Sequence, residues 1–224
     1  MDFVIIKRVV IEDKLYYNNE LLLYYKIEYP QLFSENYQSN CVRINRYLSE
    51  RAFRLVKYCV AIHFQLAIKH YRYSIERNIP IRQFELYYVY TITNNENNIL
   101  SLYYDDYRYL GGAHGMTERT SDTFNIETGD IIKLCSLFND NVDYVSLIKD
   151  YIKMEIRLQS VLDNNMYFDD YEKNVDTYFN VNNFYLTPQG IVIYFQQYEI
   201  APYAAGIPEF LIPYEQEEVV NPSC

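Results

Sequence analysis

Glycine is scarce in this chain. Among 224 residues there are only six glycines, and three of them fall in one stretch, Gly111-Gly112-Ala113-His114-Gly115. In so glycine-poor a sequence, a glycine marks a place where the backbone needs a positive φ or approaches another atom closely. This loop, and the segment from Tyr198 to Gly206, are the two regions that differ from the pattern of ordinary core.

A long hydrophobic run is also missing. No stretch approaches the roughly 18 consecutive apolar residues of a membrane span. The apolar start of the chain is interrupted by Lys7 and Arg8, and no basic region precedes it. The sequence therefore predicts neither a transmembrane helix nor a signal peptide. We expect a cytoplasmic protein from the sequence as written, and an extracellular or cell-surface one if it belongs to a longer precursor.

Motifs for metals, phosphates and nucleophiles are absent as well. The four cysteines, at positions 41, 59, 135 and 224, follow no metal-ligand spacing. The aspartate pairs 105–106 and 169–170 lack the spacing of a calcium-binding EF-hand. There is no phosphate-binding glycine loop and no nucleophile motif. The sequence thus predicts no metal and no cofactor, and it leaves the disulfide and oligomeric states open.

Positive charge is in deficit. Twenty Lys and Arg face 30 Asp and Glu, which gives a formal net charge of −10. Nucleic-acid binding depends on Lys and Arg that neutralise phosphates, so we expect no nucleic-acid partner. An acidic balance suits a cationic protein partner, and it also simply keeps a protein soluble.

The hydrophobic pattern predicts strands and helices in groups. A hairpin or three short strands over 3–28 precede a helical region over 36–76, as one helix or two. Its apolar face is formed by Ile44, Leu48, Leu55, Cys59, Ile62 and Leu66. Strands follow at 81–94, 99–110 and 117–127, then helices at 142–159 and within 164–182, then strands at 183–187, 191–195 and 209–214.

Grouped rather than alternating elements predict an α+β fold. We expect two modules, each a mainly antiparallel sheet packed against one or more helices. The first, 1–97, carries the long helix, and the second, 98–224, carries the glycine loop.

The candidate binding residues lie in the two unusual segments. They are Gly112, Ala113, His114 and Gly115 in the loop, and Tyr198, Glu199, Pro202, Tyr203 and Gly206 in the second segment. Exposed tyrosines beside rigid turns offer a large contact area at low entropic cost. The alternative is that these tyrosines pack over the sheet. His114 could act as a general base or metal ligand, but a single histidine without a nucleophile or second ligand favours a structural or binding role.

Several stretches together resemble a known family. They are Tyr29-Pro30 with Arg43-Ile44-Asn45, the loop 107–115, 125–129, 134–138 and 190–214. They are similar to the extracellular region of the lysozyme-sensing anti-sigma factor RsiV and to the non-catalytic region of the peptidoglycan deacetylase PdaC. The resemblance covers about 20–215. It implies a two-module α+β architecture and, in RsiV-like members, direct binding of lysozyme.

These observations lead to one preferred function and two alternatives. We expect a non-enzymatic binding module for a basic protein such as lysozyme or for a cell-wall glycan. One alternative is a cell-wall hydrolase that uses His114 with Glu118 or Glu199. The other is an intracellular interaction protein.

Overall fold

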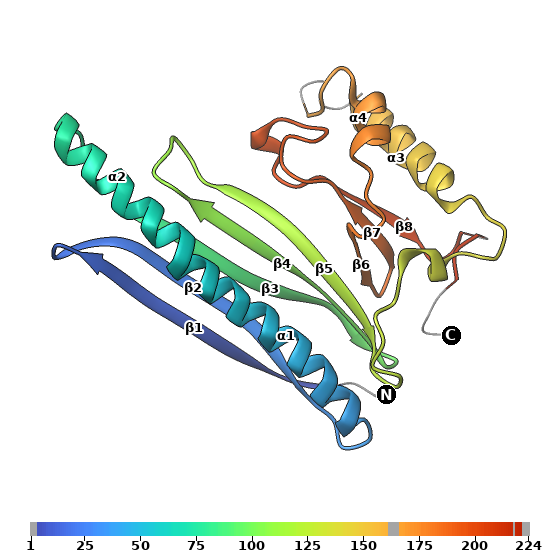
Figure 1. The fold of residues 1–224 in the computed structure, drawn as a ribbon. Coiled ribbons are helices and arrows are strands. Elements are labelled where there is room, and N and C mark those ends of the chain that lie inside the picture. The colour runs from blue at the N-terminus through green and yellow to red at the C-terminus, as the bar shows by residue number, and fades with distance from the viewer. Residues whose placement is uncertain (1–3, 161–165, 217, 221–224) are drawn as a thin grey trace. The chain divides into compact units, whose positions relative to one another are not determined.

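A computed structural model describes residues 4–160, 166–216 and 218–220 (Figure 1). Its contacts divide the chain into two compact units. We call Val4–Tyr90 with Tyr104–Glu118 the long-helix unit, and Thr91–Tyr103 with Arg119–Cys224 the C-terminal unit. The module boundary that the sequence predicts at 97/98 lies between strands β3 and β4 and stays a prediction.

The long-helix unit begins with a hairpin of two long strands. Strand β1 (Ile5–Tyr17) pairs antiparallel with β2 (Glu20–Phe33), with a register shift between Leu15 and Tyr16. The turn residues Asn18 and Asn19 both have positive φ, of 50° and 64°. Two such residues give the turn whose twist matches that of a hairpin. Of the two arrangements that the sequence left open, the single hairpin is therefore the one that forms.

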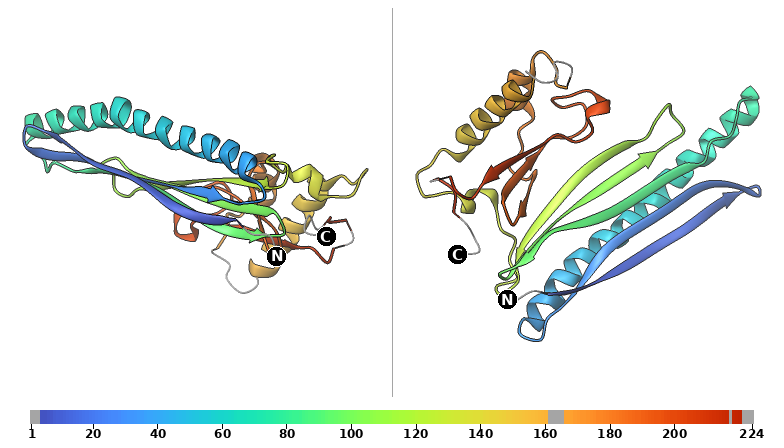
Figure 2. Two further views of the ribbon diagram at one scale, coloured as in Figure 1. Left: turned by 90° about the horizontal axis from the view of Figure 1, so that it is seen from below. Right: turned by 180° about the vertical axis from the view of Figure 1, so that it is seen from behind.

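One continuous helical element follows. It comprises α1 (Gln38–Tyr58), the π-helical segment η1 (Cys59–His63) and α2 (Phe64–Arg77). Both α1 and α2 contact β2, and the left view of Figure 2 shows the helix running along one face of these strands. Asn78, in the left-handed conformation, ends the helix because such a residue cannot continue a right-handed helix.

The predicted apolar face of this helix is wrong beyond the start of the π-helical segment. Ile62 and Leu66, which the sequence places toward the core, are 49% and 43% exposed. His63 and Ala67 are buried instead. A π-turn contains one more residue than an α-turn, so every later side chain is displaced by one position relative to a regular heptad.

Three strands connect the two units. They are β3 (Phe84–Glu96), β4 (Ile99–Tyr109) and β5 (Met116–Asn125). The five-stranded sheet has the order β1-β2-β3-β4-β5, and β2 pairs with β3 in parallel because the long helix makes the crossover between them.

The C-terminal unit contains a second sheet with its own helices. Its elements are η2 (Leu134–Leu137), α3 (Tyr144–Ser160), α4 (Tyr171–Tyr178), β6 (Phe184–Thr187), β7 (Gly190–Tyr194), η3 (Tyr203–Ala205) and β8 (Glu209–Pro213). The strands form an antiparallel sheet of order β6-β7-β8. Every residue of β7 is buried, and three isoleucines of α3 at 148, 152 and 156 join the same core.

The predicted α+β class is therefore confirmed: a mainly antiparallel five-stranded sheet and a three-stranded sheet, each with helices. None of the helices in the described ranges is both long and apolar enough to cross a bilayer.

Candidate functional site

The glycine loop joins β4 to β5 in the long-helix unit. Arg82, just before β3, donates hydrogen bonds to the carbonyl oxygens of Gly111 (3.1 Å) and Gly112. The Tyr109 hydroxyl also donates to the Gly112 carbonyl (3.2 Å). The carbonyl groups of Gly111 and Gly112 lie outside the strands, and these hydrogen bonds satisfy them and hold the loop in one conformation. No sequence motif indicates this role of Arg82.

Two glycines of the loop are demanded by the fold. Gly111 has φ 81°, and Gly115 lies so close to the ring of Tyr107 that a Cβ would collide with it. A Cβ on Gly112 would meet only ordinary contact, 3.8 Å from the His114 carbonyl oxygen. Of the two glycines among the candidate binding residues of this loop, Gly115 is therefore required by the close packing of Tyr107, whereas Gly112 is not.

His114 and Ala113 form the exposed tip of this loop. The His114 Nδ1 lies 2.9 Å from the carbonyl oxygen of Gly115, which fixes the ring relative to the backbone. An exposed imidazole held in this way can contact a partner. A general base, by contrast, works best in an enclosed site that excludes water.

The second candidate segment lies between β7 and β8 in the C-terminal unit. Tyr198 is 45% exposed and has φ 68°, a conformation that non-glycine residues adopt only when their surroundings enforce it. Its ring centroid lies 5.7 Å from that of Tyr203. Pro202 precedes η3, and Gly206 ends it with φ 70°. Exposed and half-exposed rings thus lie side by side on a rigid turn.

Glu199 stabilises this turn from within. Its Oε2 accepts a hydrogen bond from the Gln196 backbone N–H at 2.6 Å, and its own N–H donates to the Gln196 carbonyl at 3.2 Å. Burial raises the pKa of the Glu199 carboxyl. The two bonds between Gln196 and Glu199 close the turn that presents Tyr198, so Glu199 is a structural residue of this segment.

Arg119 of β5 anchors the same segment. The Gln196 amide accepts from the Arg119 N–H (2.8 Å) and donates to the Arg119 carbonyl (2.7 Å). The Arg119 guanidinium pairs with Glu209 of β8 and lies 3.7 Å from the ring centroid of Tyr103. Both ends of the tyrosine segment are therefore tied to one buried arginine. No sequence pattern identifies Arg119 as an anchor, because an isolated arginine in a strand belongs to no motif.

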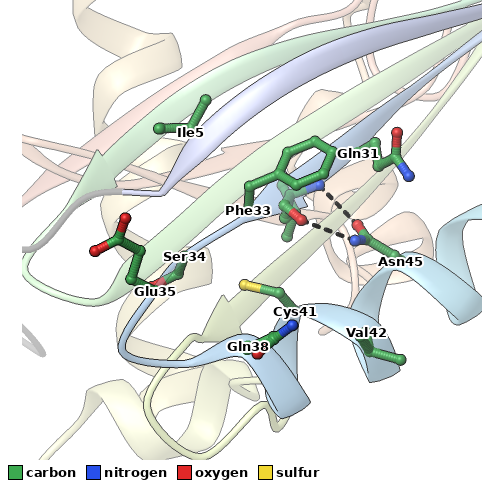
Figure 3. A pocket seen from close by; sticks show the side chains of 10 residues that line it. Ile5, Gln31, Phe33, Ser34, Glu35, Gln38, Cys41, Val42 and Asn45 are labelled. Carbon is green, nitrogen blue, oxygen red and sulfur yellow. Dashed lines mark hydrogen bonds between the residues drawn. The ribbon is translucent and has the colours of Figure 1, made fainter.

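A hollow of 540 Å³ lies where β2 passes into α1. Asn45 of α1 bonds the Leu32 backbone there, accepting from its N–H (2.7 Å) and donating to its carbonyl (2.8 Å), as Figure 3 shows. The lining includes Phe33, Cys41 and Val42. Burial raises the pKa of the Cys41 thiol, so this thiol is not activated as a nucleophile.

The π-helical segment places a histidine in the core of the long-helix unit. His63 lines a cavity of 20 Å³ with Cys59, Asp106 and Arg108. Burial, helped by the Arg108 charge and opposed by Asp106, lowers the pKa of His63. Burial also raises the pKa of Cys59 to about 11. Within the described ranges, neither ring nitrogen of His63 has a hydrogen-bond partner.

Among the described residues, no three His, Cys, Asp or Glu side chains are placed so that they could together hold a metal ion. Cys41, Cys59 and Cys135 are free thiols, whereas Cys224 lies outside the described residues. The predicted site residues fall into two places: Gly112 to Gly115 lie in the long-helix unit, and Tyr198 to Gly206 lie in the C-terminal unit.

Comparison with known proteins matches both halves of the chain. Residues 17–117 match the family model described as "Deacetylase PdaC", and residues 136–215 match "Protein of unknown function (DUF3298)". No relative is found among curated proteins.

Two crystal structures have a similar fold. One is a DUF3298 family member from Bacteroides fragilis, with 19% identity and a TM-score of 0.68, covering 97% of this chain and 94% of that one. The other is a DUF3298 family protein from Pseudomonas aeruginosa, with 15% identity and a TM-score of 0.68, covering 99% and 96%. The resemblance to the PdaC region that the sequence indicated is therefore confirmed: residues 17–117 are similar to a PdaC-type region, and residues 136–215 are similar to a DUF3298 region.

Proposed function

We propose that this protein is a non-enzymatic binding module whose C-terminal unit contacts a basic protein of the lysozyme type. The observation that carries the proposal is the pair Tyr198 and Tyr203, held side by side on an anchored turn of a strongly acidic unit. The match to a DUF3298 region shows the kind of domain but not its partner, so the ligand rests on this chemistry.

The acidic charge is concentrated in one unit. Residues 91–103 and 119–224 contain 6 Lys and Arg against 18 Asp and Glu, a balance of −12. The long-helix unit contains 14 against 11, a balance of +3. A basic partner is therefore attracted toward the C-terminal unit. Such complementarity raises the association rate and suppresses wrong partners more than it adds affinity.

The tyrosine pair contributes the binding affinity that charge complementarity alone does not provide. Aromatic rings that are already ordered lose little entropy on binding. Tyr198 and Tyr203 are ordered by Glu199, by Gln196 and by the Arg119 anchor. Truncating such an anchor residue in an interface costs about 2 kcal/mol or more, which is about 30-fold in Kd.

A cell-wall glycan is the second candidate ligand, and the match to a PdaC-type region supports it. The same tyrosines could stack on sugar rings. An uncharged glycan would bind with little dependence on salt, because no ion pairs form. The salt dependence of binding therefore distinguishes a basic protein ligand from an uncharged glycan.

The hydrolase alternative is weaker. It needs His114 in an enclosed site, and the His114 side chain is exposed. Of its two proposed partner carboxylates, Glu199 accepts a hydrogen bond from the Gln196 N–H within a turn, and Glu118 lies 3.7 Å from the Arg108 guanidinium. We therefore favour the binding function over hydrolysis.

The test is calorimetric titration of the whole chain with a c-type lysozyme at low and physiological salt. We expect saturable binding that weakens with salt but persists. The double variant Tyr198→Ala/Tyr203→Ala should lose at least about 30-fold in affinity, whereas Tyr178→Ala, which removes an equally exposed tyrosine on α4 (44%), should bind as the native chain does. His114→Ala tests whether the glycine loop takes part.

Three outcomes would contradict the proposal. Binding that disappears at physiological salt would show only nonspecific electrostatic attraction between an acidic and a basic protein. Equal loss in the double variant and in Tyr178→Ala would remove the tyrosine pair from the contact. Absence of heat with lysozyme, together with salt-independent binding of peptidoglycan fragments, would assign the glycan instead.

A further inference from the structure

The long helix is basic although the protein is acidic. Residues 38–77 contain eight Lys and Arg and only two Asp and Glu. The basic residues are Arg43, Arg46, Arg51, Arg54, Lys57, Lys69, Arg72 and Arg77. Only Arg51 of these has a half-buried side chain, and it points to the rings of Tyr88 and Tyr104. The other seven are exposed, so the helix presents a positive face to its surroundings.

Large apolar side chains are exposed among these charges. They are Val42 (63%), Phe53 (54%), Val60 (42%), Ile62 (49%), Leu66 (43%) and Tyr73 (51%). Single exposed apolar residues are common, but a series of them along one element indicates an interaction surface. Val42 also lines the hollow between β2 and α1. The buried stripe of α1 is formed by other residues, among them Ile44, Leu48 and Ala52.

The π-helical segment extends the exposed apolar series. Without it, Ile62 and Leu66 would continue the buried face, and the exposed apolar series would lose both of them. With it, the buried positions pass to His63 and Ala67. Apolar side chains are therefore interspersed with basic ones on the exposed side of the whole element, which is about 60 Å long.

We propose that this outward face of α1, η1 and α2 docks on the surface of an anionic lipid bilayer. Basic side chains gain attraction to lipid phosphates, and the interspersed Val, Phe, Ile and Leu side chains enter the boundary of the acyl region. A long helix supported by a sheet is a suitable shape for an extended planar partner. The acidic charge elsewhere does not forbid this, because screening limits charge effects to about 8 Å at physiological salt.

Other occupants fit less well. A purely acidic polymer would use the charges and leave Phe53, Ile62 and Leu66 in water. A second copy of this helix would bring two faces, each with a balance of +6 over 38–77, against one another, and like charges at close range are destabilising. A bilayer with acidic headgroups supplies both kinds of contact that the face offers.

The experiment is co-sedimentation of the whole chain with vesicles. One set contains equal parts of phosphatidylcholine and phosphatidylglycerol, and the other contains phosphatidylcholine alone. We expect partition onto the anionic vesicles only, weaker as salt rises, because each basic residue near such a surface contributes about fivefold in binding.

Two variants separate charge from apolar contact. Arg54→Glu/Lys57→Glu should reduce partition at least about tenfold. Its matched control is Lys133→Glu/Lys173→Glu in the C-terminal unit, where both lysines are exposed; it changes the net charge equally and should bind like the native chain. Phe53→Ser/Leu66→Ser should lower partition while retaining the salt dependence. Circular dichroism confirms that each variant keeps its helix.

The proposal is overturned by several results. Equal binding to both kinds of vesicle, or equal loss in the helix variant and its control, would show that the face is not specific for anionic lipid. Binding of poly-glutamate with no vesicle binding would assign an acidic protein partner. Self-association lost in Arg54→Glu/Lys57→Glu, again without vesicle binding, would assign a second copy.

Discussion

The guanidinium of Arg119 lies 3.7 Å from the ring centroid of Tyr103, and the same arginine pairs with Glu209. The arginine side chain is only 9% exposed, whereas that of Glu209 is 41% exposed. A buried cation is tolerated only where an opposite charge and an aromatic face compensate for lost hydration. This relationship ties β5 to the strand that follows the tyrosine segment, and it leads to the first prediction.

Replacement Arg119→Met should destabilise the protein by about 2–4 kcal/mol, because the ion pair and the cation–π contact are lost together and Glu209 keeps an unpaired charge. Urea unfolding measures the change. Arg157→Met is the control, since its pair with Glu172 is formed by side chains 71% and 56% exposed and should contribute less than about 1 kcal/mol. Similar losses in both variants would show that burial of Arg119 is unimportant.

The glycine loop should respond unequally to alanine. Gly115→Ala brings a Cβ against the Tyr107 ring and should cost about 1–3 kcal/mol, whereas Gly112→Ala should change the free energy of unfolding by less than about 0.5 kcal/mol. Thermal unfolding distinguishes them. If Tyr107→Leu restores the stability of Gly115→Ala, the ring is the cause of the loss. Equal stability of the two alanine variants would remove the close approach as the reason for Gly115.

His63 should make stability depend on pH. Its native pKa is lowered by burial and by Arg108, against the opposing charge of Asp106. The unfolded chain therefore binds the proton more tightly than the native one. The contribution to stability is complete above the ordinary imidazole pKa of about 6.5 and decreases as the pH falls below it.

Urea midpoints measured on both sides of that pH should show this loss in the native chain. His63→Leu should reduce the slope over the same range, and His114→Ala, at the exposed tip of the glycine loop, should keep it. An unchanged slope in His63→Leu would assign the pH dependence to other groups.

Thiol reactivity should separate three of the cysteines. Cys135 is exposed, whereas Cys41 and Cys59 are buried and burial raises the pKa of both, to about 11 for Cys59. Since the thiolate is the reactive form, brief treatment with iodoacetamide near pH 8 should alkylate Cys135 and spare the other two. Peptide mass spectrometry measures the fraction of each cysteine that is alkylated. Rapid modification of Cys59 would mean that the π-helical segment opens readily.

Much of the fold could be predicted from the sequence because local rules decided it. Asn18-Asn19 and the Asn97-Asn98 turn adopt the positive φ that short hairpins require. Ile148, Ile152 and Ile156 mark one face of a helix by spacing alone, and all three are buried. The apolar run 191–195, four residues of which belong to β7, is buried throughout, as its lack of alternation predicts.

Other features depended on tertiary contacts. No local pattern shows that the helix changes to π-helical geometry at Cys59, because the choice of buried face is made by packing on β2. No motif shows that Arg82 fixes the glycine loop or that Arg119 anchors Tyr198 and Tyr203, because these partners are separated by tens of residues.

The sequence by itself determined the α+β class, most of the elements, and the two segments where glycine and tyrosine depart from ordinary core. Tertiary structure decided which of those residues build turns and which face outward. It also decided how the chain divides into two units, which places a charge balance of −12 in one unit and +3 in the other. The reason is physical: spacing along the chain sets local periodicity, whereas burial, ion pairing and the sign of a surface arise only when distant segments pack together.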